Sequence, residues 1–96
     1  MKPSEALKQH RAKVFKIIVS NETLNPRIFG SVANGTDTED SDLDILVDPT
    51  SKTTLMNIGE IRHQLLSLLN VPVDIITPKS LPENIRLKVI SEAKPL

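Results

Sequence analysis

Apolar residues recur at helical spacing in three parts of the chain. This periodicity predicts helices over residues 4–20, 52–69 and about 83–93. Ser4 is the expected N-cap of the first helix, and Ser80 with Glu83 matches a capping box at the start of the last. The middle helix has the most regular apolar face, which consists of Leu55, Ile58, Ile61, Leu65, Leu68 and Leu69.

Short apolar runs between these helices predict β-strands at residues 27–29, 43–47 and 71–76. Residues 31–34 are compatible with one helical turn that Gly35 would end, and residues 36–41 form a polar loop. Alternation of strands and helices predicts an α/β (α+β) fold with helices on both faces of the sheet. We expect a single domain over residues 1–96, with a small mixed sheet of about three to four strands and about four helices.

Composition narrows the class of function. Lys plus Arg and Asp plus Glu both number 12, so the net charge is zero, and the only aromatic residues are Phe15 and Phe29. Neither a general basic field nor a base-stacking platform is available, which makes nucleic acid an unlikely partner. Cysteine is absent, and no apolar run approaches the length that spans a membrane. These features favour a cytoplasmic protein without a membrane partner.

The most informative segment couples a Gly-Ser turn to a pair of acidic residues. Gly30-Ser31 is followed, after ten residues, by Asp42 and Asp44, and Asp44 lies within the predicted strand 43–47. Side chains at positions i and i+2 of a strand point to the same face, so the two carboxylates would project together. Their mutual repulsion is relieved most simply by a hard divalent cation, which prefers oxygen ligands.

A third carboxylate interrupts the apolar run of the last predicted strand. If that strand neighbours strand 43–47, Asp74 can join Asp42 and Asp44 on one surface. Three convergent carboxylates could hold two Mg²⁺ ions about 3.5–4 Å apart, an arrangement that serves in-line displacement at phosphorus. Gly30 would permit close backbone approach to a phosphate chain, and the amides following Ser31 would face it.

Simpler interpretations exist for each of these residues. The acidic pair could be a solvated strand end, Asp74 a charge at a strand terminus, and Ser31 an ordinary helix N-cap. The neighbouring loop acids Asp37, Glu39 and Asp40 are expected to be hydrated, and neither His10 nor His63 is expected to bind metal.

Two phosphate- or cation-binding loops can be excluded. The spacing of Gly30 and Gly35 approaches that of a P-loop, but the required lysine is absent. A calcium loop starting at Asp40 would need glycine where Ile45 stands and glutamate where Ser51 stands.

Gly-Ser-x10-Asp-x-Asp with a third Asp on a later strand resembles the nucleotidyltransferase superfamily typified by DNA polymerase beta. The small size is similar to its minimal nucleotidyltransferase branch, the MntA-like antitoxins that pair with HEPN-domain toxins. The resemblance runs from about Pro26 to the C-terminal segment 85–96.

The resemblance implies a nucleotidyltransferase fold and defined roles for the motif residues. Asp42, Asp44 and Asp74 would be catalytic and would bind two Mg²⁺ ions, with Asp74 also helping to deprotonate the acceptor hydroxyl. Gly30 and Ser31 would bind the triphosphate of a nucleoside triphosphate, which we expect to be ATP. The resemblance also suggests the acceptor, a tyrosine of a partner HEPN-type toxin. Attachment of AMP to this tyrosine would inactivate the toxin.

One departure from the family pattern keeps a second function open. Members of this branch often carry arginine where this chain has Asn34, which would contact phosphate but cannot neutralise its charge. The alternative is therefore a catalytically weak or inactive antitoxin that neutralises its partner by binding alone. A nucleotide-binding or structural subunit without transfer activity is a third possibility.

Overall fold

A four-stranded mixed sheet with strand order β3-β2-β1-β4 organises the fold. The computed structural model describes residues 1–96. Its helices are α1 (Pro3–Val19), α2 (Gly30–Asn34), α3 (Leu55–Leu69) and α4 (Glu83–Glu92), with a 3-10 turn η1 (Pro78–Ser80). Its strands are β1 (Thr23–Phe29), β2 (Leu43–Pro49), β3 (Val73–Ile76) and β4 (Lys94–Pro95). β1 is antiparallel to β2 and β4, and β2 is parallel to β3, so the expected mixed sheet and number of helices are confirmed.

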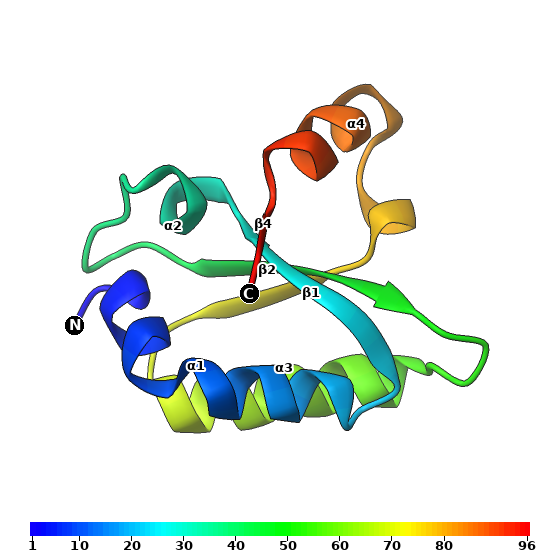
Figure 1. The fold of residues 1–96 in the computed structure, drawn as a ribbon, viewed down its shortest axis with the longest axis horizontal. Coiled ribbons are helices and arrows are strands. Elements are labelled where there is room, and N and C mark those ends of the chain that lie inside the picture. The colour runs from blue at the N-terminus through cyan, green and yellow to red at the C-terminus, as the bar shows by residue number, and fades with distance from the viewer.

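The hydrophobic core lies between one face of this sheet and the helices α1 and α3, which run side by side beneath it (Figure 1). β2 is the central contributor, since Leu43, Ile45 and Val47 are completely buried. Because side chains alternate along a strand, Asp44 must then project from the opposite face. Packing of the core thus fixes the direction of the acidic side chain.

The second face of the sheet is covered less completely. α4 lies across this side (Figure 1), but none of its residues is fully buried. Leu46 of β2 and Leu81 before α4 are buried outside the main core cluster. The expectation of helices on both faces is met, although the second layer leaves room around the acidic positions. No helix combines the length and apolar character needed to cross a bilayer.

The start of α1 differs from the sequence prediction. Lys2 occupies the N-cap position and Pro3 the first helical position, so Ser4 is not the cap. The Ser4 amide instead donates to the Asp37 carboxylate at 2.9 Å, and this hydrogen bond holds the pKa of Asp37 below its ordinary value. Asp37 is nearly buried, so its expected role as a hydrated loop residue was wrong. A loop acid caps a helix more than thirty residues away in the sequence.

The ends of several other helices and strands differ from the sequence prediction because of local interactions. β1 starts earlier than predicted because a bulge around Asn25, whose φ is +52°, lets the strand continue past Pro26. α3 begins later because the Thr54 hydroxyl accepts from the Asn57 amide and caps it there. The predicted capping box at Ser80 is wrong, because its hydroxyl bonds within η1 and α4 starts after it. The short strand β4 was not predicted.

Candidate active site

Asp44 and Asp74 lie directly beside each other on neighbouring strands. β2 and β3 are parallel, and their register pairs Asp44 with Asp74. Adjacent strands are about 4.8 Å apart, and residues paired in register share a face of the sheet. The core-facing neighbours Leu43 and Val73 are paired in the same way, so both carboxylates belong to the opposite face. The predicted adjacency of the second and third strands is correct.

Asp42 precedes β2 by one residue and is exposed. Its negative charge acts on Asp44, because the carboxylates of Asp74 and Asp42 both add to the effect of burial in raising the pKa of Asp44. Burial contributes most, and together these causes raise the pKa of Asp44 to about 6. Near neutral pH the site therefore holds negative charge that its own environment disfavours.

None of the three carboxylates has a partner within the protein. The carboxylates that accept hydrogen bonds or ion pairs are those of Glu5, Asp37, Glu39, Asp48 and Glu60. No buried side-chain polar atom lacks a partner, so the unpaired oxygens of Asp44 still reach solvent. Asp42, Asp44 and Asp74 are thus free to bind a ligand from outside.

The donor set suits a hard cation, but the side chains are not gathered around one position. No group of three Asp, Glu, His or Cys side chains is close enough to hold a single ion as they stand. Unpaired, electrostatically coupled carboxylate oxygens are the ligands that Mg²⁺ prefers. Their assignment as metal ligands stays a prediction.

Gly30 lies against Asp44 at the junction of β1 and α2. Its φ is +71°, and a Cβ atom built there would be 2.5 Å from Asp44 Oδ2. The preceding Phe29 is paired in register with Asp44 across the antiparallel strands. Only glycine satisfies both the left-handed backbone and the close approach of the carboxylate. The structure therefore brings the Gly-Ser turn and Asp44 together.

Ser31 does not act as a helix cap. The N-cap of α2 is Phe29, which makes no side-chain cap, and the Ser31 hydroxyl forms no hydrogen bond within the protein. The Ser31 carbonyl accepts from the Thr36 amide at 2.9 Å, and Gly35 ends the helix in the left-handed conformation as predicted. The simpler interpretation of Ser31 as an ordinary N-cap is therefore wrong, and its hydroxyl is free.

A cavity of about 240 Å³ adjoins this turn. Its lining comes from the end of β1, from α2 and from α4: Phe29, Gly30, Asn34, Ile85, Lys88, Val89 and Glu92. Gly30 and Asn34 were predicted from the sequence as nucleotide-binding residues. The α4 residues were not, and the four-residue spacing of Lys88 and Glu92 was the only available signal that they share a helix face.

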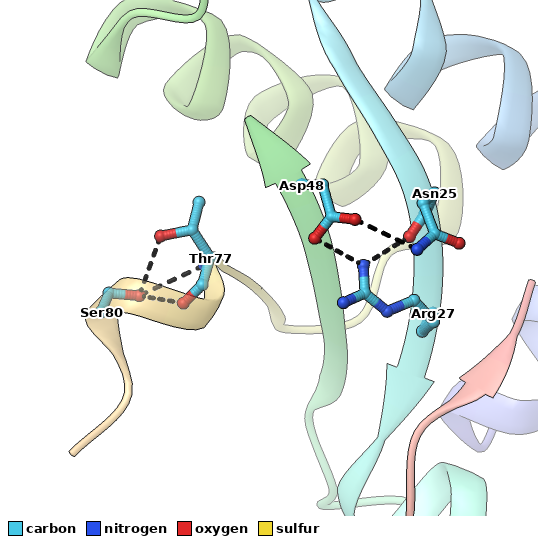
Figure 2. A network of polar contacts seen from close by, with 5 residues as sticks. All are labelled: Asn25, Arg27, Asp48, Thr77 and Ser80. Atoms are coloured by element: carbon cyan, nitrogen blue, oxygen red, sulfur yellow. Dashed lines mark hydrogen bonds and ion pairs between the residues drawn. The ribbon is translucent and has the colours of Figure 1, made fainter. Parts of the chain in front are cut away.

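The basic residue on this face of the sheet, Arg27, is already paired with an acidic side chain. Arg27 of β1 donates to Asp48 of β2 at 3.0 Å and to the Asn25 carbonyl at 2.7 Å (Figure 2). Asn25 also donates to Asp48 at 3.1 Å, whereas Thr77 and Ser80 form a separate network in η1 (Figure 2). Since Arg27 is 11% exposed and paired, it is not available to a ligand.

Comparisons with known proteins identify the family and the fold. The model of the nucleotidyltransferase domain family matches residues 11–96. The chain is 38% identical over 65 residues to protein adenylyltransferase MntA of Thermococcus cleftensis, a match that covers 68% of this chain and 66% of the relative. A solved structure of a "putative minimal nucleotidyltransferase" superimposes with a TM-score of 0.87 at 38% identity, covering 97% of this chain and 95% of the other.

A toxin–antitoxin crystal structure with AMP-PNP also shares the fold. Its TM-score is 0.74 at 26% identity, and the match covers 88% of this chain and 69% of that chain. The family model spans both acidic strands, the Gly-Ser turn and the cavity. The predicted family and fold are confirmed: the chain belongs to the nucleotidyltransferase domain family, with the fold of its minimal members.

Proposed function

We propose that this protein transfers a nucleoside monophosphate, AMP from ATP, to a hydroxyl group of a partner protein. The placement of Asp44 beside Asp74, with Gly30 against Asp44, is the observation that carries this proposal. It joins two unpaired carboxylates to a backbone turn that approaches one of them, Asp44, closely. The similarity to protein adenylyltransferase MntA, and the AMP-PNP in a related toxin–antitoxin structure, support an adenine nucleotide as the substrate.

Asp42, Asp44 and Asp74 are the residues that would hold Mg²⁺. Bound Mg²⁺ would neutralise charge on the phosphates and on the acceptor oxygen in an in-line displacement. The raised pKa of Asp44 supports this role, because a cation would relieve the repulsion among the carboxylates.

The chain's own groups would orient the nucleotide. Gly30 removes side-chain bulk next to Asp44, the free Ser31 hydroxyl can donate to a phosphate oxygen, and Asn34 lines the adjoining cavity. In the transfer, the acceptor oxygen forms a bond to the α-phosphorus and the bond to the bridging oxygen of pyrophosphate breaks. Asp74 is the proposed acceptor of the hydroxyl proton. Positioning and charge neutralisation supply most of the catalysis in such reactions.

We propose a HEPN-type toxin as the partner and a tyrosine as the acceptor residue. The relation to a toxin–antitoxin complex supports a protein partner of this kind. The decisive experiment incubates the chain with α-labelled ATP, Mg²⁺ and the product of the adjacent gene. Label should appear on the partner and should be lost in the D42A/D44A variant. A partner that stays unlabelled with the wild-type chain would refute transfer.

A binding-only antitoxin is the second candidate, favoured by the carboxylates not being gathered into a ready metal site. Survival of cells that carry the partner distinguishes the two functions. If D42A/D44A protects cells as well as the wild type does, inhibition rests on binding. If protection is lost while the complex still forms, inhibition rests on transfer.

A further inference from the structure

The cavity next to the Gly30 turn is lined by a lysine without a partner. Lys88 of α4 lines this cavity together with Gly30 and Asn34. Only its backbone carbonyl takes part in a side-chain hydrogen bond, from Ser91, and neither ion pair of the protein involves it. An ammonium group has three donors and no acceptor capacity, so an unpaired one at a cavity wall can bind an anion.

The arginines cannot take this role as readily, because each already donates to the protein itself. Their acceptors are the Pro95 carbonyl for Arg11, Asp48 for Arg27, the Val73 carbonyl for Arg62 and the Pro78 and Leu81 carbonyls for Arg86. None of the four lines the cavity. Lys88 is the one cationic side chain in the cavity wall, and it is free.

The position of the cavity defines what kind of anion Lys88 would meet. Gly30 forms part of its wall and also lies against Asp44, so one wall residue joins the cavity to the acidic positions, although no Asp carboxylate lines the cavity itself. A phosphate chain placed there would be repelled by Asp42, Asp44 and Asp74 unless positive charge balanced it. Cations on the carboxylate side can balance one end of the chain, and Lys88 can balance the other.

We propose that Lys88 binds the β- and γ-phosphates of the nucleoside triphosphate, the part that leaves as pyrophosphate. This inference rests on the proposed function. Lys88 forms and breaks no covalent bond and remains protonated throughout. It stabilises charge on the substrate and on the leaving group from the α4 side of the cavity.

Glu92 gives the proposal a test of opposite sign. It lies four residues after Lys88 on α4 and lines the same cavity, without an ion pair to it. Its negative charge should weaken phosphate binding. Replacing Glu92 with glutamine should therefore strengthen binding where replacing Lys88 weakens it.

The test is calorimetric titration with Mg²⁺ and three probes: a non-hydrolysable ATP analogue, inorganic pyrophosphate and AMP. K88Q should bind the analogue and pyrophosphate about tenfold more weakly than the wild type, with AMP unchanged. K88R should retain most of the affinity, and E92Q should bind the analogue a few-fold more tightly. K13Q is the matched control, because Lys13 is exposed on α1, beneath the opposite face of the sheet.

Two results would overturn the role of Lys88 and leave the proposed function standing. One is equal affinity of K88Q and the wild type for the analogue and pyrophosphate. The other is an equal loss for AMP, which would mean that the cavity holds the nucleoside. Failure of the wild type to bind the analogue at all would instead refute the proposed function, and the role of Lys88 with it.

Discussion

Replacing Asp44 with asparagine should stabilise the ligand-free protein at neutral and alkaline pH. Burial on β2, with the nearby Asp74 and Asp42 carboxylates, raises the pKa of Asp44 from 3.8 to about 6. At pH 8 the folded protein therefore holds a charge that its surroundings disfavour. Asparagine keeps nearly the same shape and removes the charge.

The sign of the pH dependence follows from proton binding. Between about pH 4 and pH 6 the folded state keeps the Asp44 proton that the unfolded chain has released, so stability falls as the pH rises. Above about pH 6 the penalty is constant. A pKa difference of about two corresponds to at most about 3 kcal/mol. Because water reaches the Asp44 oxygens and screens their charge, we expect about 1–2 kcal/mol.

The assay is urea denaturation of D44N and wild type, followed by far-ultraviolet circular dichroism because the chain has no Trp or Tyr. Divalent ions are removed with EDTA, and stability is measured at pH 8, 6 and 4. A gain of about 1–2 kcal/mol at pH 8 should shift the urea midpoint upward. In thermal unfolding, the same gain corresponds to a rise in Tm of roughly 5–10 °C for a chain of this length. The gain should vanish near pH 4.

D40N is the control, because Asp40 is exposed on the polar loop and its carboxylate makes no hydrogen bond within the protein. Its stability should match that of the wild type at every pH. A D44N protein that is no more stable than wild type at pH 8 would refute the reasoning. An equal gain at pH 4 and pH 8 would also refute it, since a charge effect must depend on ionisation.

Three further experiments, two single substitutions and one double-mutant cycle, probe contacts around the site. Gly30→Ala should lower the free energy of unfolding by about 1–3 kcal/mol, because its Cβ would meet Asp44 Oδ2 and its φ is +71°; unchanged stability in urea would contradict the close approach. Asp37→Ala should cost about 1 kcal/mol through loss of the α1 cap, and the cost should shrink in acid, since Asp37 stabilises the fold in its ionised form. A double-mutant cycle with Arg27→Met and Asp48→Asn should give a coupling near 1 kcal/mol; a value near zero would mean that the pair is only a surface contact.

The direction of Asp44 was predictable because it depends on local alternation, whereas Asp42 lies just outside the strand. In β2, Leu43, Ile45 and Val47 face the core, and strand parity alone places Asp44 on the opposite face, which it shares with the buried Leu46. Asp74 required one further assumption, that β3 neighbours β2. That assumption held because short apolar runs on either side of one helix usually form adjacent parallel strands.

The missed features all depend on contacts between distant segments. Asp37 looked like one more acid in a hydrated loop, and only the docking of that loop on α1 gives it an amide to accept from. The bulge at Asn25 lets a strand pass through Asn-Pro, a dipeptide that normally signals a break. The contribution of α4 to the cavity likewise depends on where that helix crosses the sheet, which its weak apolar pattern does not specify.

The parallel pairing of Asp44 with Asp74 limits where residues can be inserted into or deleted from the chain. Inserting or deleting a single codon within β2 would reverse the facing of every strand residue on one side of the change. Either buried aliphatic residues would leave the core or Asp44 would turn toward it, and both outcomes disrupt the fold that positions the site. A length change after Asp37, in the polar loop at residues 38–41, leaves the strand pairing and the α1 cap in place and falls outside this constraint. We therefore expect natural variation in chain length to accumulate in that loop and to be absent from the paired strands.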